Sequence, residues 1–323
     1  MKTITKFRSF VIVACLAMVS LSGCSVVDHL TRGRSTPDPA LVSKDFAEPE
    51  VIARIDSALI DESSGLTASK CRPYVFWTHN DSGGGPYVYA FGLKGVLLGV
   101  WKVEGAKNRD WEDIASAKEE DGKCYLYIGD IGDNEQGRDS VTVYRVEEPD
   151  TSAGSVSRKK EDAARTAEAS EIEITYPDGK WNAETLMVHP STFDLYVVSK
   201  EKSPEARVFR VRSSVWRDAG ADSKIKSEAV GKLTMPSVLG GFLTGGEISP
   251  DGRRVVICDY VGAYELSLEN DQKEFDSVWK STPQIIETGP REQGESVAYS
   301  SDGSALFLTS EKVPVPLIRI KRK

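Results

Sequence analysis

The sequence predicts an all-β fold, a five-bladed β-propeller formed by residues 49–323. Short runs rich in aromatic and β-branched residues alternate with turns that contain Gly or Asp, which is typical of β-strands. These runs recur as four-strand units of about 50 to 70 residues, the repeat of a propeller blade. Helical periodicity is absent except in a polar insertion, residues 151–170, where a helical turn or two is expected.

The predicted strands follow the same order in each unit. A glutamate stands near the start of the first strand, and a short turn such as SPDG leads into the second. The second strands read YVFWTHND, CYLYIGD, LYVVSKE, VVICDY and LFLTSE, and the third read YVYAFG, VTVYRV, RVFRV, GAYEL and LIRI. The fourth strands read VLLGVWKV, EIEITY, EAVGKL and QIIET, and the fifth unit has none of its own.

The run PEVIARID, residues 49–56, is a strand without a unit. We expect it to supply the missing fourth strand of the last unit, because closing the ring removes edges that would otherwise pair with other chains. Six blades are the alternative, because residues 151–170 or 212–230 could contain a degenerate unit.

Four glutamates are predicted to share one position in the innermost strands. Glu62, Glu112, Glu184 and Glu295 each lie 16 to 19 residues before the acidic residue at the end of the next strand. In the fourth unit Thr244 takes this position, and Glu247 follows three residues later.

The first residues predict export and a lipid anchor. A basic start, the apolar run Phe10–Leu21 and the sequence LSGC form the order of a secretory signal, and LSGC resembles a bacterial lipoprotein lipobox. We therefore expect residues 1–23 to be a lipoprotein signal peptide, Cys24 to carry lipid such as palmitate, and residues 24–48 to be a flexible tether. An uncleaved anchor is the alternative, although the apolar run is short for a membrane span. The expected location is the extracytoplasmic cell envelope, at the outer membrane if the host is Gram-negative.

The net charge limits the classes of partner that the protein is expected to bind. Removing residues 1–23 takes three of the 41 basic residues and none of the 49 acidic ones, which leaves a net charge of −11. Such a chain does not suit nucleic acid, and it does suit cations. The expected partners are the membrane, through the lipid on Cys24, and a small-molecule or protein ligand; the protein is expected to be a monomer.

Polar residues are predicted to gather at one mouth of the propeller channel, because the first strand of a blade starts on the face where the second ends. The stretch LYIGDIGDN, residues 126–134, is one of five strand ends of this kind. Oxygen ligands suit Ca²⁺, or alternatively Mg²⁺. The predicted metal ligands are Asp81, Glu112, Asp113, Asp130, Asp133, Asn134 and Glu184. In the competing interpretation these carboxylates are purely structural and cap turns.

The same face contains candidate ligand-binding residues, namely His79, Asn80, Arg109, Glu295 and Glu311. Catalytic residues cannot be assigned, since the chain has no G-x-S-x-G, H-E-x-x-H or G-x-x-x-x-G-K motif.

Two cysteines are predicted to form a disulfide. Cys71 and Cys124 precede the second strands of consecutive units, on the face opposite the carboxylates, and the expected compartment permits disulfides. The alternative is a pair of small buried hydrophobic residues.

The motifs HNDSG, DWEDIA, GDIGDN, YPDG followed by NAETL, ISPDGRRV and GES together resemble an uncharacterised family of secreted bacterial β-propeller proteins. That family is broadly similar to esterase-like phytase propellers, and the resemblance covers about residues 55–312. It implies a propeller with a metal or ligand site at these loops, although NAETL stands where the family has DAEAL. The predicted function is a ligand- or partner-binding lipoprotein with a cation-binding face; a calcium-dependent hydrolase of phosphoesters or esters is the alternative.

Overall fold

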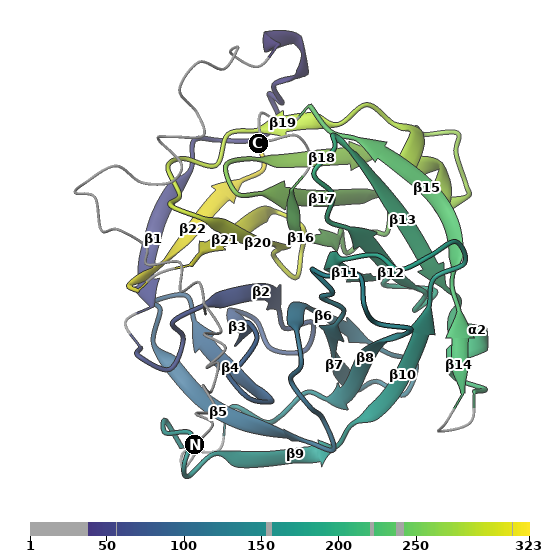
Figure 1. The fold of residues 1–323 in the computed structure, drawn as a ribbon. Helices are drawn as coiled ribbons and strands as arrows, with labels where there is room; N and C mark the ends of the chain where they lie inside the picture. Colours follow the sequence, from purple (N-terminus) through teal and green to yellow (C-terminus); the bar gives the residue numbers. More distant parts are fainter. Residues whose placement is uncertain (1–37, 56, 153–156, 220–222, 237–241, 312) are drawn as a thin grey trace, which may run out of the picture.

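The computed structural model describes residues 38–323 except 56, 153–156, 220–222, 237–241 and 312. Five β-sheets surround a central axis as the blades of a β-propeller, which confirms the predicted all-β, five-bladed fold (Figure 1). The innermost strands contact one another in ring order, from the first blade to the fifth and back to the first.

The first two blades have five strands each. From the axis outward, blade 1 consists of β2 (Ser63–Ala68), β3 (Val75–Asn80), β4 (Tyr87–Gly92), β5 (Leu97–Glu104) and β9 (Ala164–Glu168). Blade 2 consists of β6 (Trp111–Lys118), β7 (Cys124–Asp130), β8 (Val141–Glu147), β10 (Ser170–Thr175) and β14 (Lys224–Lys226).

The other three blades have four strands each. Blade 3 consists of β11 (Ala183–Val188), β12 (Leu195–Ser199), β13 (Glu205–Val211) and β15 (Glu228–Thr234). Blade 4 consists of β16 (Leu243–Ile248), β17 (Arg254–Asp259), β18 (Ala263–Ser267) and β19 (Gln284–Ile286). Blade 5 consists of β20 (Gly294–Tyr299), β21 (Ala305–Ser310), β22 (Val315–Lys321) and β1 (Glu50–Ile55).

The N-terminal strand closes the ring as predicted. β1 pairs antiparallel with β22, from Glu50 opposite Arg319 to Ile55 opposite Val315. Figure 1 shows the two strands side by side, β1 in purple and β22 in yellow. Ring closure therefore joins segments from opposite ends of the described chain.

The two segments suspected of concealing a sixth blade instead extend existing blades. β9 lies in the predicted insertion and pairs parallel with β5, and β14 lies in residues 212–230 and pairs parallel with β10. The expected helical turn does not occur in the described part of the insertion; the short helix α2 (Ser213–Trp216) follows β13 instead. Both added strands are short and mostly exposed, so their pairing depends on the sheet edges that receive them.

Hydrophobic side chains fill the five spaces between adjacent blades. Each blade contributes apolar residues from both faces of its sheet, as Trp77 and Trp111 do between blades 1 and 2. Five separate core clusters result, one for each pair of neighbouring blades. This double burial explains why the strands have long apolar runs rather than simple alternation.

Residues 38–48, assigned from the sequence to the tether, lie against blades 4 and 5. The 3₁₀ helix η1 (Pro39–Leu41) leads to a bridge between Val42 and Ile285 at the edge of blade 4. Phe46 is buried, and the Arg322 guanidinium lies 4.5 Å from its ring. The second 3₁₀ helix, η2 (Phe275–Lys280), packs between blades 3 and 4.

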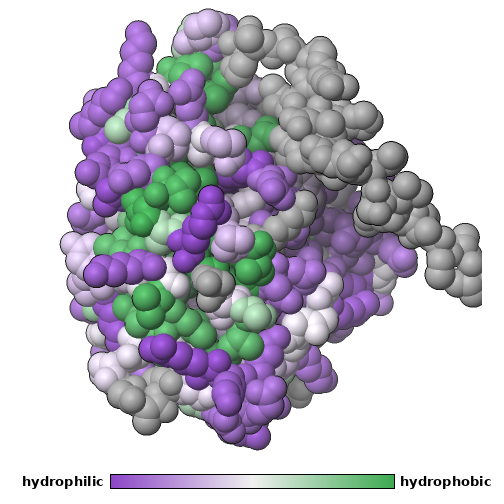
Figure 2. All heavy atoms as spheres, turned by 90° about the vertical axis from the view of Figure 1, so that its left-hand side faces the viewer, coloured by the Kyte–Doolittle hydropathy of each residue, from purple (hydrophilic) through white to green (hydrophobic). Residues whose placement is uncertain are grey.

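The outer surface is mixed in polarity. On the side that carries β1 and β5, Figure 2 shows apolar patches separated by hydrophilic side chains. Val51 in β1 and Val96 before β5 are 54% and 49% exposed. In residues 38–323, leaving aside the gaps, no helix is long and apolar enough to cross a membrane.

Candidate metal and ligand site at the channel mouth

A β-bulge occurs at the same position in all five innermost strands. The pairing register shifts between Ser63 and Leu66, Trp111 and Asp113, Ala183 and Thr185, Leu243 and Gly245, and Gly294 and Ser296. The extra residue is Glu112, Glu184, Thr244 and Glu295 in blades 2 to 5, and in blade 1 the shift contains Ser64. Bulges of this kind redirect a side chain, and here they mark the end of the channel that we call the acidic mouth.

The shared glutamate position is therefore correct in three blades and wrong in the first. Glu62 precedes β2 and is exposed, whereas Ser64 lies within the bulge. Thr244 lies at the bulge of the fourth blade as predicted. Sequence spacing alone cannot locate a bulge, because the extra residue changes the count by one.

Three carboxylates converge at the acidic mouth. Asp81 follows β3, while Asp110 and Glu112 lie at the start of β6, and one oxygen from each lies within 4.8 Å of the other two. Asp110 was not among the residues predicted from the sequence, although it is the first residue of the DWEDIA motif. Its position two residues before Glu112, at the start of an innermost strand, could have identified it.

Glu112 is the most buried of the three carboxylates. It is only 5% exposed, and its carboxylate makes no hydrogen bond or ion pair within the described chain. Burial, then the nearby charges of Glu184, Asp81 and Asp110, raises its pKa well above the usual range. Burial, then Asp81, also raises the pKa of Asp110. The three carboxylates are therefore stabilised by protonation or by a bound cation.

Gly132 explains part of the unusual GDIGDN sequence. A Cβ atom at this position would collide with the carboxylate oxygens of Glu112 and Asp110. The Gly132 N–H also donates to the Asp110 carbonyl at 3.2 Å. Glycine is needed here because the loop after β7 closes directly over the two acidic side chains.

The other polar residues of that loop are held by partners of their own. Arg138 Nη1 donates to Asp130 Oδ1 at 2.7 Å, and the Arg109 N–H donates to Asp130 Oδ2 at 3.1 Å. Asp133 accepts from the backbone N–H groups of Gly137 and Arg138, both at 2.8 Å. Asn134 is exposed and accepts from the Asn182 amide at 3.1 Å. These contacts fix the loop and lie beside the three-carboxylate group.

Glu184 forms a second polar group across the mouth. Lys200 Nζ donates to both of its carboxylate oxygens and to Tyr260 Oη at 2.7 Å. Burial raises the pKa of Glu184 to about 7, although Lys200 opposes the shift. Burial lowers the Lys200 pKa, but Glu184 outweighs this and the pKa rises overall. Phe242 stacks against Tyr260, with ring centroids 6.3 Å apart.

The remaining predicted ligand residues are distributed around the same end of the ring. Glu295 is 5% exposed and accepts from Gln293 at 2.8 Å; burial, then Glu184 and Glu311, raises its pKa well above the usual range. His79 is fully buried against Trp111, with ring centroids 5.7 Å apart. Arg109, by contrast, is exposed.

Asn80, at the end of β3, fixes the chain that enters blade 1. Its amide donates to the Leu59 carbonyl at 2.9 Å and to Asp61 at 2.7 Å. This side chain therefore holds the segment before β2 in place beside the mouth.

Asp113 lies deeper and connects blades. It accepts from the N–H groups of Ile114 at 2.8 Å, Leu186 at 3.0 Å and Gly246 at 3.4 Å, in blades 2, 3 and 4. Burial raises its pKa well above the usual range, even though these bonds oppose the shift. Its bonds to three inner strands indicate a structural role at the centre of the ring.

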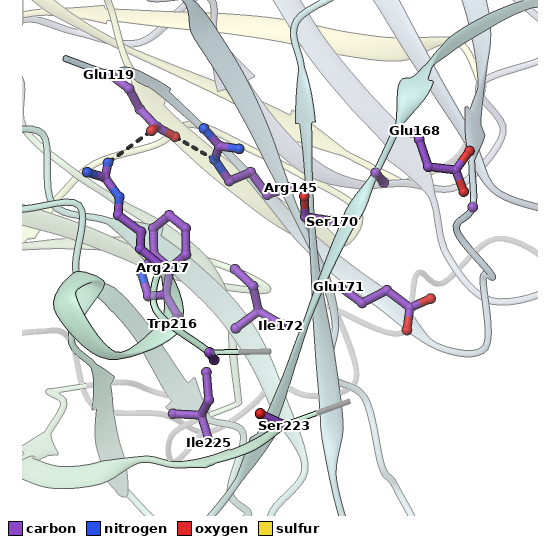
Figure 3. Close-up of a pocket in the computed structure, with 13 residues that line it drawn as sticks. Glu119, Arg145, Glu168, Ser170, Glu171, Ile172, Trp216, Arg217, Ser223 and Ile225 are labelled. Carbon is purple, nitrogen blue, oxygen red and sulfur yellow. Dashed lines mark hydrogen bonds and ion pairs between the residues drawn. The ribbon is translucent and has the colours of Figure 1, made fainter. Parts of the chain in front are cut away.

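A separate hollow lies away from the acidic mouth, at the outer rim of blade 2 (Figure 3). Its volume is about 820 Å³, and Ile172, Trp216 and Arg217 are among its lining residues. Glu119 forms ion pairs with Arg145 at 2.6 Å and with Arg217 at 2.9 Å. None of the residues predicted from the sequence lines this hollow.

No family model and no curated protein matches this chain. Among solved structures, hydrazine synthase of Kuenenia stuttgartiensis is 16% identical with a TM-score of 0.39, covering 78% of this chain and 56% of that one. A chain of a mitotic checkpoint complex is 11% identical with a TM-score of 0.39, covering 81% and 62%. This chain thus spans less than two thirds of both, and at this similarity neither bears on function.

Proposed function

We propose that this protein is a binding lipoprotein of the cell envelope whose acidic mouth holds a divalent cation, Ca²⁺ in preference to Mg²⁺. Asp81, Asp110 and Glu112 would supply the ligands, and the bound ion would help to hold a small-molecule or protein ligand. The observation that carries the proposal is Glu112, a buried carboxylate without a partner beside two further carboxylates.

The physical reason is the cost of three like charges in a partly buried site. Desolvation and mutual repulsion disfavour the ionised carboxylates unless a cation neutralises them. Carboxylate oxygens are hard ligands, and the larger, more flexible coordination of Ca²⁺ tolerates an irregular set of loop and strand residues better than Mg²⁺ does.

The location is part of the same proposal. Lipid on Cys24 would hold the propeller at the extracytoplasmic face of a membrane, at the outer membrane in a Gram-negative host. Calcium sites in extracellular modules work at dissociation constants of about 10⁻⁴ to 10⁻³ M, a range that suits three carboxylates and a protein outside the cytoplasm.

The test is metal-dependent thermal stability of the full-length protein after chelation. A cation that binds only the folded state at 100 times its dissociation constant stabilises it by about 2.7 kcal/mol. Added CaCl₂ should therefore raise the Tm by on the order of 5 °C. Glu112→Gln should abolish the rise, and Glu269→Gln, an exposed substitution just after β18 at the end of blade 4 opposite the mouth, should retain it. An equal response in all three proteins, or no response in the wild type, would contradict the proposal.

The catalytic alternative makes a separate claim. The motif resemblance would extend the site to calcium-dependent hydrolysis, with the ion polarising a phosphoester or ester. If this alternative is correct, the protein releases product from one or more esters in a panel of phosphoesters and carboxylic esters. Chelation of calcium and the Glu112→Gln substitution should each abolish that release. Calcium-dependent stabilisation without turnover supports binding alone.

A further inference from the structure

The opposite end of the channel has the reverse charge. Here the innermost strands end, and a small cavity of about 140 Å³ is lined by residues from all five blades. The lining comprises Lys70, Ala115, Ser116, Ala117, Lys118, Val188, Pro190, Glu247, Ile248, Pro250 and Ser301. We call this cavity the lower opening.

Among the described residues that line the lower opening, Glu247 is the only carboxylate, and its oxygens already accept three hydrogen bonds. Glu247 is 4% exposed and accepts from Thr67 Oγ1 at 2.8 Å, Lys70 Nζ at 2.9 Å and the Tyr299 N–H at 2.6 Å. These bonds join blade 4 to blades 1 and 5, so Glu247 acts as a structural link. Its charge is balanced by Lys70.

Donors without acceptors remain around the same cavity. The Ser116 hydroxyl is buried and has no hydrogen-bond partner within the described chain, and the residue is only 5% exposed. Lys118 is exposed, and its ammonium makes no ion pair with any described residue. Lys70 has three N–H groups, of which Glu247 receives one. Two lysines and one glutamate leave a net positive charge.

We propose that the lower opening binds a small inorganic anion. An anion would accept from Ser116 and Lys70 and would neutralise the excess charge of Lys118. The alanine, valine and proline residues of the wall make one side of the cavity apolar, which strengthens such charged contacts. The volume admits a halide or a small oxyanion.

The test uses the line width of the ³⁵Cl NMR signal, which broadens when chloride exchanges with a protein site. Full-length wild-type protein in chelator should broaden the signal, and added sulfate should reverse the effect. The double variant Ser116→Ala/Lys118→Gln should lose at least two thirds of the broadening. Both changes preserve folding, because one removes an unpartnered hydroxyl and the other lies at the surface.

Two controls separate this site from other effects. Lys94→Gln removes the same charge from the exposed hairpin between β4 and β5 and should leave the broadening unchanged. Glu112→Gln should also leave it unchanged, so the result is independent of the proposed cation site. Broadening that is absent in the wild type, retained in the double variant, or lost equally in Lys94→Gln would overturn the proposal.

Discussion

At the scale of single residues, the clearest property of the mouth is its excess of buried carboxylates. Burial raises the pKa of Glu184 in the folded protein to about 7, against an ordinary value of 4.5. The folded state therefore takes up a proton at a higher pH than the unfolded state, and acidification stabilises the fold. The gain begins as the pH falls through about 7 and is complete below 4.5.

This gives a prediction for metal-free protein. The Tm should rise as the pH falls from 8 to 5 in the presence of chelator, and Glu295 should contribute in the same direction because its pKa is also raised. Glu184→Gln should flatten the profile between pH 8 and 6, while the exposed control substitution Glu269→Gln should preserve it. A wild-type Tm that falls over this range would show that these carboxylates are not destabilised in the fold.

A second residue-scale prediction concerns Arg138, which is 9% exposed and neutralises Asp130, itself 2% exposed. Arg138→Met should destabilise the protein by about 3 to 5 kcal/mol, since it leaves a buried charge without a partner. Asp130→Asn/Arg138→Met should recover part of this loss. Urea unfolding measures both, and a double variant less stable than Arg138→Met would contradict the ion-pair explanation.

At the scale of elements, the innermost strands are packed so closely that glycine is required where two of them meet. A Cβ atom on Gly65 would lie 2.7 Å from His79 Nε2 and from the Ile114 nitrogen. Gly65→Ala should therefore cost about 1 to 3 kcal/mol by overpacking. Gly137→Ala, which meets only Asp133 Oδ1 at 4.0 Å, should stay within about 0.5 kcal/mol of wild type. Equal losses in the two variants would argue against strand crowding.

The element scale also shows what the sequence reveals and what it conceals. Strand runs, turns and the orphan run at 49–56 were readable because strands buried on both faces need apolar residues and their hairpins need Gly or Asp. The added strands β9 and β14 could not be predicted, because their sequences ARTAE and KIK contain few apolar residues and form strands only against an existing sheet edge.

The candidate site was partly predictable for a related reason. Topology placed Asp81 and Glu112 at one end of the channel, and they do converge. Which carboxylates remain without partners depends on loop paths: Arg138 reaches Asp130 from eight residues away, and Lys200 reaches Glu184 across a hairpin. The loop that brings Asp110 to Asp81 has no sequence period that would reveal it.

At the scale of the whole molecule, the blades are held together by links between neighbours. Cys71 and Cys124, the cysteines that the sequence pairs, form a disulfide between blades 1 and 2 across a separation of 53 residues. Replacing both by alanine should lower the free energy of unfolding by about 4 kcal/mol in the chain-entropy model. Guanidinium unfolding of oxidised wild type and variant measures this, and equal midpoints would rule out a stabilising link.

The pairing of β1 with β22 also determines when the molecule can finish folding. The ion pair between Glu50 and Arg319 joins residues 269 positions apart, so the last blade cannot be completed until nearly the whole described chain is available. Until then β1, whose Val51 stays half exposed even in the finished ring, has no sheet to join. Such late, long-range pairing is slow and leaves intermediates open to association. For a chain synthesised from its N-terminus, the vulnerable interval would extend from the emergence of residue 50 to the emergence of residue 321, and the closing of the ring would end it.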